Sequence, residues 1–339
     1  GATWIYVRKC GAWEKQAKLY GTLTSGASSQ GTAVSLSADG NTLAVGGPTD
    51  NGNTGAVWIF VRSECGKWSQ QGAKLVVTGV VDFPVLSRTG DAVDLSADGN
   101  TLVVGSRNSV NTNLVATTGL ITVFTRTAGT WSQGPSTFSS TLLVSNGQVT
   151  KRLGTRVSIS ADGTVIAAGG LDSVVIFSLL SGVLTEVQVL ESPNPGNNFG
   201  VTGLDLSADG LNLAVGATAQ NTVGAVYIYA NVAGVWTLQG LPIEVTDLLS
   251  PDPRFGYSVS FSGDASTLAV GAFRDNTTEG AVYVFTRTGT NWVKREKLIG
   301  PPYQGDVYQG ASVALSSEGS TLAVGSDIQA SNAMFWIWV

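Results

Sequence analysis

Residues 31–75 read GTAVSLSADGNTLAVGGPTDNGNTGAVWIFVRSECGKWSQQGAKL and contain one complete copy of a unit that recurs along this 339-residue chain. Apolar and polar residues alternate over 33–37, and the turn Ala38-Asp39-Gly40 follows. A D-G pair between two apolar runs predicts a tight β-hairpin, because glycine adopts the positive φ of such a turn without strain. The partner strand at 42–46 is almost wholly apolar, which predicts burial on both faces. A strand rich in aromatic and β-branched residues is expected at 56–62, and a fourth strand from about 68 to 75 after a short turn.

The acidic residue of this turn recurs on average about every 56 residues, at Asp39, Asp98, Asp162, Asp209, Asp264 and Glu318. This period is typical of a four-stranded propeller blade, which cannot bury both faces of its own sheet and must stack on its neighbours. The sequence therefore predicts an all-β fold, a β-propeller of four-stranded antiparallel blades in one domain over 1–339. Its repeat units are expected at 1–30 (partial), 31–88, 89–152, 153–198, 199–254, 255–309 and 310–339 (partial).

The predicted strands favour six blades slightly, and they fit seven blades if residues are missing at the chain ends. The chain opens on a pair of third and fourth strands between Thr3 and Leu19 and closes on another apolar third strand at 335–339. In a six-bladed ring this last strand is surplus, and an apolar surplus strand is an edge that pairs readily with another chain.

Several repeats share further residues that resemble a known family. Phe-Gly opens two units, Gly-Ala ends two second strands, and a third strand reads GAVYVF, at Phe199-Gly200, Phe255-Gly256, Gly216-Ala217, Gly271-Ala272 and 280–285. This pattern resembles the FG-GAP repeat of integrin α-subunit propellers, and most closely the short-turn version in bacterial, algal and giant-virus proteins. The resemblance implies the fold and leaves function open. Integrin-like repeats hold calcium in an acidic loop between the first two strands. Here Ser35, Ser37 and Leu43 stand in place of those acids, so no cofactor is expected.

Composition excludes several classes of function. The chain has no histidine, which removes histidine-based triads and the common zinc sites. A net charge of −5 without a basic cluster argues against nucleic acid, and no apolar run is long enough for membrane insertion. Cys10 and Cys65 hold the same place in successive repeats, too far apart for a disulfide, so two free thiols are expected.

Two sets of oxygen-bearing side chains are candidate sites. The loops after two second strands carry Asp50, Asn51, Asn53, Asp275 and Asn276, which form either Asx turns, the favoured interpretation, or weak cation sites. Asp94 and Asp205 stand four residues before their turn acids, on the innermost strand, where they are expected to line the channel. A hydrated polar lining is favoured there, and an acid/base pair is the alternative.

Aromatic residues form the other candidate site. One position at the start of the fourth strand holds Trp13, Trp68, Trp131, Trp236 and Trp292, which are expected to pack the blades together, with the arginines at Arg8, Arg62, Arg126 and Arg287 over the indoles or on loop carbonyls. The aromatic residues outside this pattern are candidates for a binding surface, namely Trp336, Trp338, Tyr303 and Tyr308.

The sequence favours a non-enzymatic propeller that serves a structural or protein-interaction role in an extracellular, cell-surface or virion assembly. The expected partners are other proteins, including further copies or domains of the same assembly. A carbohydrate-binding lectin, with a glycan as ligand, is the alternative. A hydrolase or lyase centred on Asp94 and Asp205 is the third candidate, and it is disfavoured because no nucleophile or basic clamp recurs near them.

Overall fold

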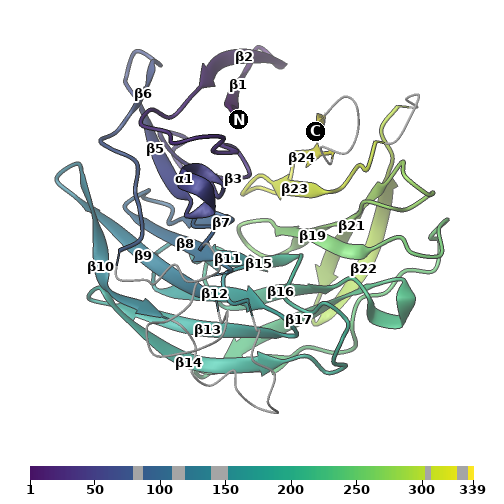
Figure 1. The fold of residues 1–339 in the computed structure, drawn as a ribbon. Helices are drawn as coiled ribbons and strands as arrows, with labels where there is room; N and C mark the ends of the chain where they lie inside the picture. The colour runs from purple at the N-terminus through teal and green to yellow at the C-terminus, as the bar shows by residue number, and fades with distance from the viewer. Residues whose placement is uncertain (79–86, 109–118, 139–151, 302–306, 327–334) are drawn as a thin grey trace. The chain divides into compact units, whose positions relative to one another are not determined.

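The computed structural model describes residues 1–78, 87–108, 119–138, 152–301, 307–326 and 335–339, and Figure 1 shows their strands. Contacts between Cα atoms divide the chain into two compact units. The first contains Gly1–Gly170 and Ser178–Thr185, and the second contains Leu171–Phe177 and Glu186–Val339. Each unit is described by itself below.

The fold is a β-propeller of antiparallel blades, as the repeat predicts. Six inner hairpins each begin a blade, and five blades have all four strands. The helices α1 (Asp50–Asn53) and η2 (Gln220–Thr222) are single turns. None of the helices that the structure describes has the length and apolarity needed to cross a membrane. The first complete blade contains β3 (Ala33–Leu36), β4 (Thr42–Gly47), β5 (Ala56–Arg62) and β6 (Trp68–Gln70), and the second contains β7 (Ala92–Leu95), β8 (Thr101–Ser106), β9 (Leu120–Thr127) and β10 (Thr130–Phe138). The third contains β11 (Arg156–Ile159), β12 (Val165–Gly170), β13 (Ser173–Leu180) and β14 (Val183–Glu191), and the fourth contains β15 (Leu204–Leu206), β16 (Asn212–Ala217), β17 (Ala225–Val232) and β18 (Val235–Leu238). The fifth contains β19 (Phe255–Phe261), β20 (Thr267–Ala272), β21 (Ala281–Thr288) and β22 (Asn291–Leu298).

The sixth blade has three strands, β23 (Ser312–Leu315), β24 (Leu322–Gly325) and β25 (Phe335–Trp338). The expectation of a surplus C-terminal strand is wrong, because β25 pairs with β24 in the register Leu322↔Trp338 that a third strand adopts. A separate two-stranded sheet contains β1 (Thr3–Lys9) and β2 (Ala12–Leu19).

The aspartate of an inner hairpin closes its turn. Asp39 Oδ1 accepts hydrogen bonds from Ser37 Oγ at 2.5 Å and from the backbone N–H of Asn41 at 2.9 Å. These bonds, led by that of Ser37, hold the pKa of Asp39 below its usual value. Asp98, Asp162 and Asp264 make the same pair of contacts. The carboxylates are therefore engaged by the turn itself, as an Asx-type role requires.

Neighbouring blades pack through alternate apolar residues and a close glycine contact. In the first unit, Val93 and Leu95 of β7 lie in one cluster with Ala44 and Ile59 of the preceding blade. A Cβ on Gly46 would lie 2.1 Å from the carbonyl oxygen of Gly90. The two backbones therefore approach each other so closely here that no side chain fits at Gly46.

The indole at the start of the fourth strand joins adjacent blades. Trp68 Nε1 donates to Gln16 Oε1, and Trp131 Nε1 donates to Gln71 Oε1, each at 2.9 Å. The guanidinium of Arg126 lies 5.3 Å from the Trp131 ring, and those of Arg62 and Arg287 lie similarly over Trp68 and Trp292. These contacts confirm the packing role predicted for Trp68, Trp131 and Trp292, whereas Trp13 is exposed. Both cysteines, Cys10 and Cys65, are free and exposed, as expected.

Candidate functional site

The two loops considered as weak cation sites hold a lysine against their buried carboxylates. In the first unit, Asp50 accepts from Lys74 Nζ and from the backbone N–H of Ser25. In the second unit, Lys297 Nζ lies 2.7 Å from Asp275 Oδ2. An ammonium group therefore balances each carboxylate. Nowhere among the described residues do three or more His, Cys, Asp or Glu side chains gather as metal ligands would.

The amides of these loops serve the turns. Asn51 and Asn53 adopt positive φ, as Asn tolerates better than most residues. Asn276 also has positive φ, and its amide Nδ2 donates to Glu279 Oε2 at 2.5 Å.

Asp94 and Asp205 lie in different units, and each accepts a backbone hydrogen bond from the next blade. Asp94 Oδ2 accepts from the N–H of Ile159 at 2.9 Å, while its Oδ1 accepts from Ser35 Oγ at 2.8 Å. Asp205 Oδ2 accepts from the N–H of Phe261 at 2.7 Å. Burial, the largest influence on Asp94, raises the pKa of its carboxyl to about 6 against these hydrogen bonds, which lower it. Both carboxylates thus link first strands of adjacent blades.

Three of the four predicted aromatic binding residues fall within the described residues. Trp336 and Trp338 are half-buried and pack against a core cluster with Leu322 and Val324. The Tyr308 ring lies 6.0 Å from the ring of Phe273. Tyr303 falls outside the described residues.

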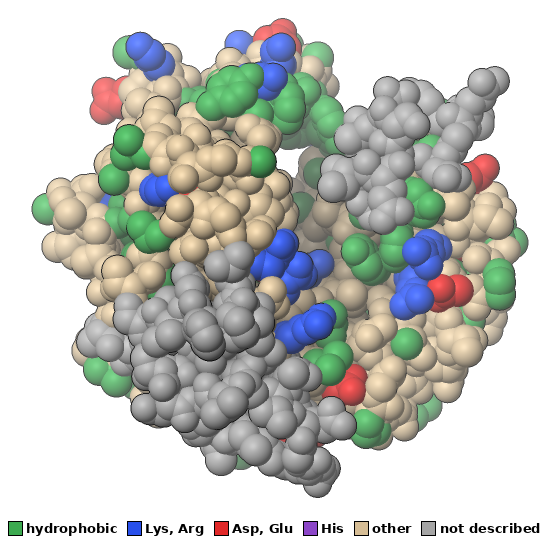
Figure 2. All heavy atoms as spheres, viewed as in Figure 1, with side chains coloured by type: hydrophobic (Ala, Val, Ile, Leu, Met, Phe, Trp, Pro, Cys, Tyr) green, Lys and Arg blue, Asp and Glu red, His purple; other side chains and the backbone are tan. Residues whose placement is uncertain are grey.

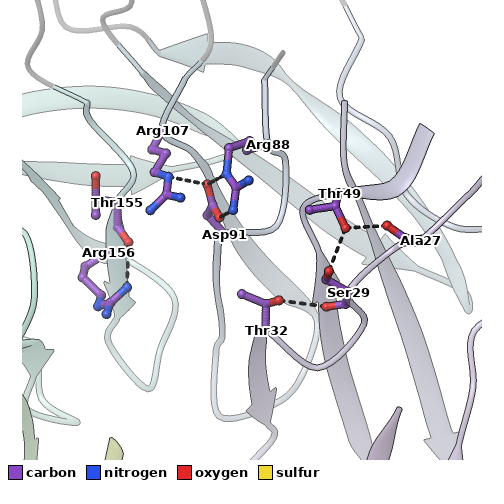
Figure 3. Close-up of polar contacts among 9 residues, drawn as sticks. All are labelled: Ala27, Ser29, Thr32, Thr49, Arg88, Asp91, Arg107, Thr155 and Arg156. Atoms are coloured by element: carbon purple, nitrogen blue, oxygen red, sulfur yellow. Dashed lines mark hydrogen bonds and ion pairs between the residues drawn. The ribbon is translucent and has the colours of Figure 1, made fainter. Parts of the chain in front are cut away.

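A charged cluster in the first unit is the site that repeat reasoning missed. Arg88 forms a two-pronged contact with Asp91, from Nε to Oδ2 at 3.1 Å and from Nη2 to Oδ1 at 3.0 Å. Arg107 Nε lies 2.9 Å from Asp91 Oδ2. Figure 3 shows the two guanidinium groups on either side of the carboxylate. We call Arg88, Asp91, Arg107 and Arg152 the arginine cluster.

Positive charge exceeds negative charge in the arginine cluster. Burial, first, and the charges of Arg88 and Arg152 lower the pKa of Arg107, while Asp91 opposes them. Asp91 thus contacts two guanidinium groups, and the charge of a third, that of Arg152, also acts on Arg107, in a chain whose net charge is −5. Nearby, Arg156 Nη1 donates to the carbonyl of Thr155 at 3.1 Å. Figure 2 shows groups of Lys and Arg side chains on one face of the molecule. Such an excess of guanidinium groups suits an anionic ligand, since arginine binds carboxylate and phosphate through paired N–H groups.

The backbone that positions the cluster is the same in every repeat. Arg88 and Arg152 have positive φ and stand two residues before the glycine that packs against the preceding blade. The N–H of Asp91 donates to the carbonyl of Arg88, just as Thr155 donates to Arg152 and Thr32 donates to Ser29. The Thr32 and Thr155 hydroxyls also bond to those carbonyls, at 2.8 and 2.7 Å (Figure 3 draws the first). At the same position Asp91 binds arginine side chains instead.

The side chains at these positions are not required by the fold. Counted from the repeat's glycines, Asp91, Arg107 and Arg152 correspond to Tyr257, Phe273 and Tyr308 in a later repeat. There the Tyr257 and Phe273 rings lie 4.1 Å apart, and Tyr308 completes an aromatic row. One backbone framework thus carries a charged cluster in one place and stacked rings in another. The sequence signal for this site is a departure from the repeat, because Asp91 stands at the position that Thr32 and Thr155 hold in two other units.

The comparisons with known proteins concern the fold and one repeat. The FG-GAP repeat model matches residues 249–285, which confirms the resemblance in that repeat. A search of curated protein sequences finds no match. Similar solved structures include a putative 6-phosphogluconolactonase from Bacteroides uniformis (13% identity, TM-score 0.59, 90% of this chain and 83% of that chain). Another is a putative 6-phosphogluconolactonase from Bacteroides fragilis (15%, 0.59, 96% and 86%). A third is the periplasmic gluconolactonase of Pseudomonas aeruginosa (16%, 0.61, 99% and 94%).

These neighbours correct the function expected from the sequence. A non-enzymatic structural or interaction propeller, with a lectin as its alternative, is contradicted by neighbours that carry the names of lactonases. The expectation failed because it was drawn from the residues that recur, and those residues build the blades. At 13–16% identity the likeness establishes the fold alone.

Proposed function

We propose that this propeller is a hydrolase of sugar lactones that carry an anionic group, with the arginine cluster as its substrate site. The observation that supports the proposal is that Asp91 holds two guanidinium groups, those of Arg88 and Arg107, while the charge of Arg152 also acts on Arg107. The lactonase names of the structural neighbours supply the reaction class.

The proposed hydrolysis of the lactone depends mainly on electrostatic stabilisation of its transition state. Water attacks the lactone carbonyl carbon, the bond from that carbon to the ring oxygen breaks, and the ring oxygen leaves as a hydroxyl after taking a proton. Negative charge develops on the carbonyl oxygen in the transition state, and a prearranged guanidinium stabilises it. Arg107, held in place by Asp91, fits this role. Arg152 fits the anionic group of the substrate.

Asp91 acts as a positioning residue in this scheme. Its two oxygens hold Arg88 and Arg107 in fixed orientations. Its negative charge offsets the repulsion between the two guanidinium groups. No cofactor enters the proposed reaction. We also propose that the protein works in a secreted or surface-exposed setting. FG-GAP repeats and the periplasmic location named for the Pseudomonas neighbour support that setting.

The proposal is tested by following proton release from 6-phosphogluconolactone and from uncharged gluconolactone. The protein is expected to hydrolyse the phosphorylated lactone with the higher kcat/KM. Arg107→Gln is expected to lower that kcat/KM by about a hundredfold, the usual effect of losing one donor to a developing oxyanion. Arg254→Gln is the matched control, because Arg254 holds the repeat position of Arg88 in the other unit. Hydrolysis no faster than in buffer for both lactones would refute the proposal.

A further inference from the structure

A cavity of about 300 Å³ in the second unit lies between the loop before β15 and the loop after β16. Asn194, Gly196, Asn197, Gln220 and Asn221 are among the residues that line it, and we call it the amide cavity. Asn197 and Gln220 are 4% and 8% exposed. Gln220 Oε1 accepts hydrogen bonds from Asn194 Nδ2 at 3.2 Å and from Asn197 Nδ2 at 3.0 Å. The amides of the wall therefore hold one another in place.

Two other blades show what the loop position of Gln220 holds elsewhere. Asp50, Gln220 and Asp275 are equivalent, because the backbone oxygen of each accepts from the glycine that precedes a third strand. The Asp50 carboxylate binds the ammonium group of Lys74, and Lys297 Nζ lies 2.7 Å from Asp275 Oδ2. Where this position is acidic, a lysine from the fourth strand of the same blade therefore neutralises it.

The blade with the amide cavity keeps the aromatic ring of this arrangement but not the lysine. The two ammonium groups lie over an aromatic residue of the third strand, 6.0 Å from the ring centroid of Trp58 and 5.3 Å from that of Tyr283. Tyr227 holds the same place on β17. Pro242 stands at the lysine position, directly before the residue that bonds to the third strand. At this position of the repeat the blade therefore has no ammonium group of its own.

Two carboxylates are bonded to the wall of the amide cavity. Asp172 Oδ2 accepts from the backbone N–H of Gly196 at 2.7 Å, and Asp172 Oδ1 is buried without a hydrogen-bond partner. Glu244 Oε1 accepts from Asn221 Nδ2 at 3.0 Å. Among the residues that the structure describes, no lysine or arginine forms an ion pair with either carboxylate. Because a buried carboxylate oxygen is costly without a partner, the electrostatics of this region favour a cation.

We propose that the amide cavity binds a primary alkylammonium ion, which takes the position that lysine holds in the other two blades. Its N–H groups donate to amide oxygens of the wall. The Tyr227 ring and the carboxylates of Asp172 and Glu244 stabilise its charge. A metal ion is a poorer match, since no group of three His, Cys, Asp or Glu side chains gathers anywhere in the described part of the chain.

The probe for this site is n-butylammonium, which has the shape of a lysine side chain. Isothermal titration calorimetry of the full chain at constant ionic strength is expected to show saturable binding, with Kd of about 1 mM. Gln220→Asp adds a carboxylate beside the ligand and should raise the affinity at least about threefold. Gln220→Asp/Pro242→Lys builds the ion pair of the other blades and should lower the affinity at least about tenfold.

The matched control is Thr288→Asp/Asn291→Lys, which adds the same two charges to paired, exposed positions of β21 and β22. It is expected to bind n-butylammonium as wild type does. Binding of equal strength by wild type and by Gln220→Asp/Pro242→Lys would overturn the proposal. So would no saturable binding to wild type, or equal binding of the uncharged 1-pentanol, which would show that the cavity takes the alkyl chain alone. Displacement of n-butylammonium by calcium at a lower concentration would overturn it as well, in favour of a metal site.

Discussion

The carboxylate of Asp94 accepts a hydrogen bond of 2.9 Å from the backbone N–H of Ile159, one repeat further along the chain. Ser35 Oγ accepts from the N–H of Leu95 at 3.0 Å, and Ser260 Oγ accepts from the N–H of Leu315 at the same distance. One side-chain acceptor on each of these first strands thus reaches the first strand of the next blade. Asp94 therefore bonds one blade to the next, and its predicted place on the lining of a channel stays a prediction.

The raised pKa of Asp94 makes stability depend on pH. Its folded pKa of about 6 lies above the value of about 3.9 in an unfolded chain, so folding favours the protonated form. The resulting stability is fully present below about pH 4 and is lost as pH rises through about 6. We expect Tm of wild type, relative to that of Asp94→Asn, to fall between pH 4 and 7 in thermal melts.

Asp39→Asn is the control of opposite sign for that experiment. The lowered pKa of Asp39 means that its contribution is present above about pH 4 and is lost as pH falls through the folded value. A constant Tm difference between wild type and Asp94→Asn across the whole range would contradict the assignment.

The ion pair in the loop of the second unit should be structural. Lys297→Met leaves the fully buried Asp275 carboxylate with Tyr283 and backbone donors but without a counter-charge. Breaking such a pair costs about 3–5 kcal/mol of the free energy of unfolding, which urea denaturation would measure. Lys9→Met, which removes an exposed ion pair with Glu14, should cost less than about 1 kcal/mol. A rise in Tm of wild type on adding calcium would instead indicate a cation site in these loops.

The Trp131–Gln71 contact should matter for blade packing. Trp131→Phe removes the indole N–H, so Gln71 Oε1 loses that donor, and the cation–π contact with Arg126 weakens. We expect a loss of about 1–2 kcal/mol in the free energy of unfolding. Trp13→Phe, at the same repeat position but exposed, should lose less. Equal losses for the two variants would show that the hydrogen bond between blades contributes nothing.

The framework of the blades could be predicted from the sequence because it depends on local and repeated signals. The Asp39-Gly40 turn, the apolar run at 42–46 and the Trp68 position each gave the correct element, since each uses residues that recur in most units. The sixth blade was misjudged because strand counting cannot tell which third strand bonds to β24.

The arginine cluster could not be predicted in the same way. The positive φ at Arg88 recurs at the equivalent residue of other repeats, but the side chains of Asp91 and Arg107 that complete the ion pairs do not recur. Comparing equivalent positions would have shown Asp91 replacing Thr32 and Thr155. Because the residues of this site depart from the repeat, a search for recurring residues does not find it.

The binding of 6-phosphogluconate, measured by isothermal titration calorimetry, tests most directly whether the arginine cluster is an anion site. The account predicts saturable binding to wild type and a loss of affinity of at least about tenfold in Arg88→Gln/Arg107→Gln, since each lost charge-assisted hydrogen bond is worth a comparable factor. Equal affinity in the two proteins, or no binding to wild type, would contradict it.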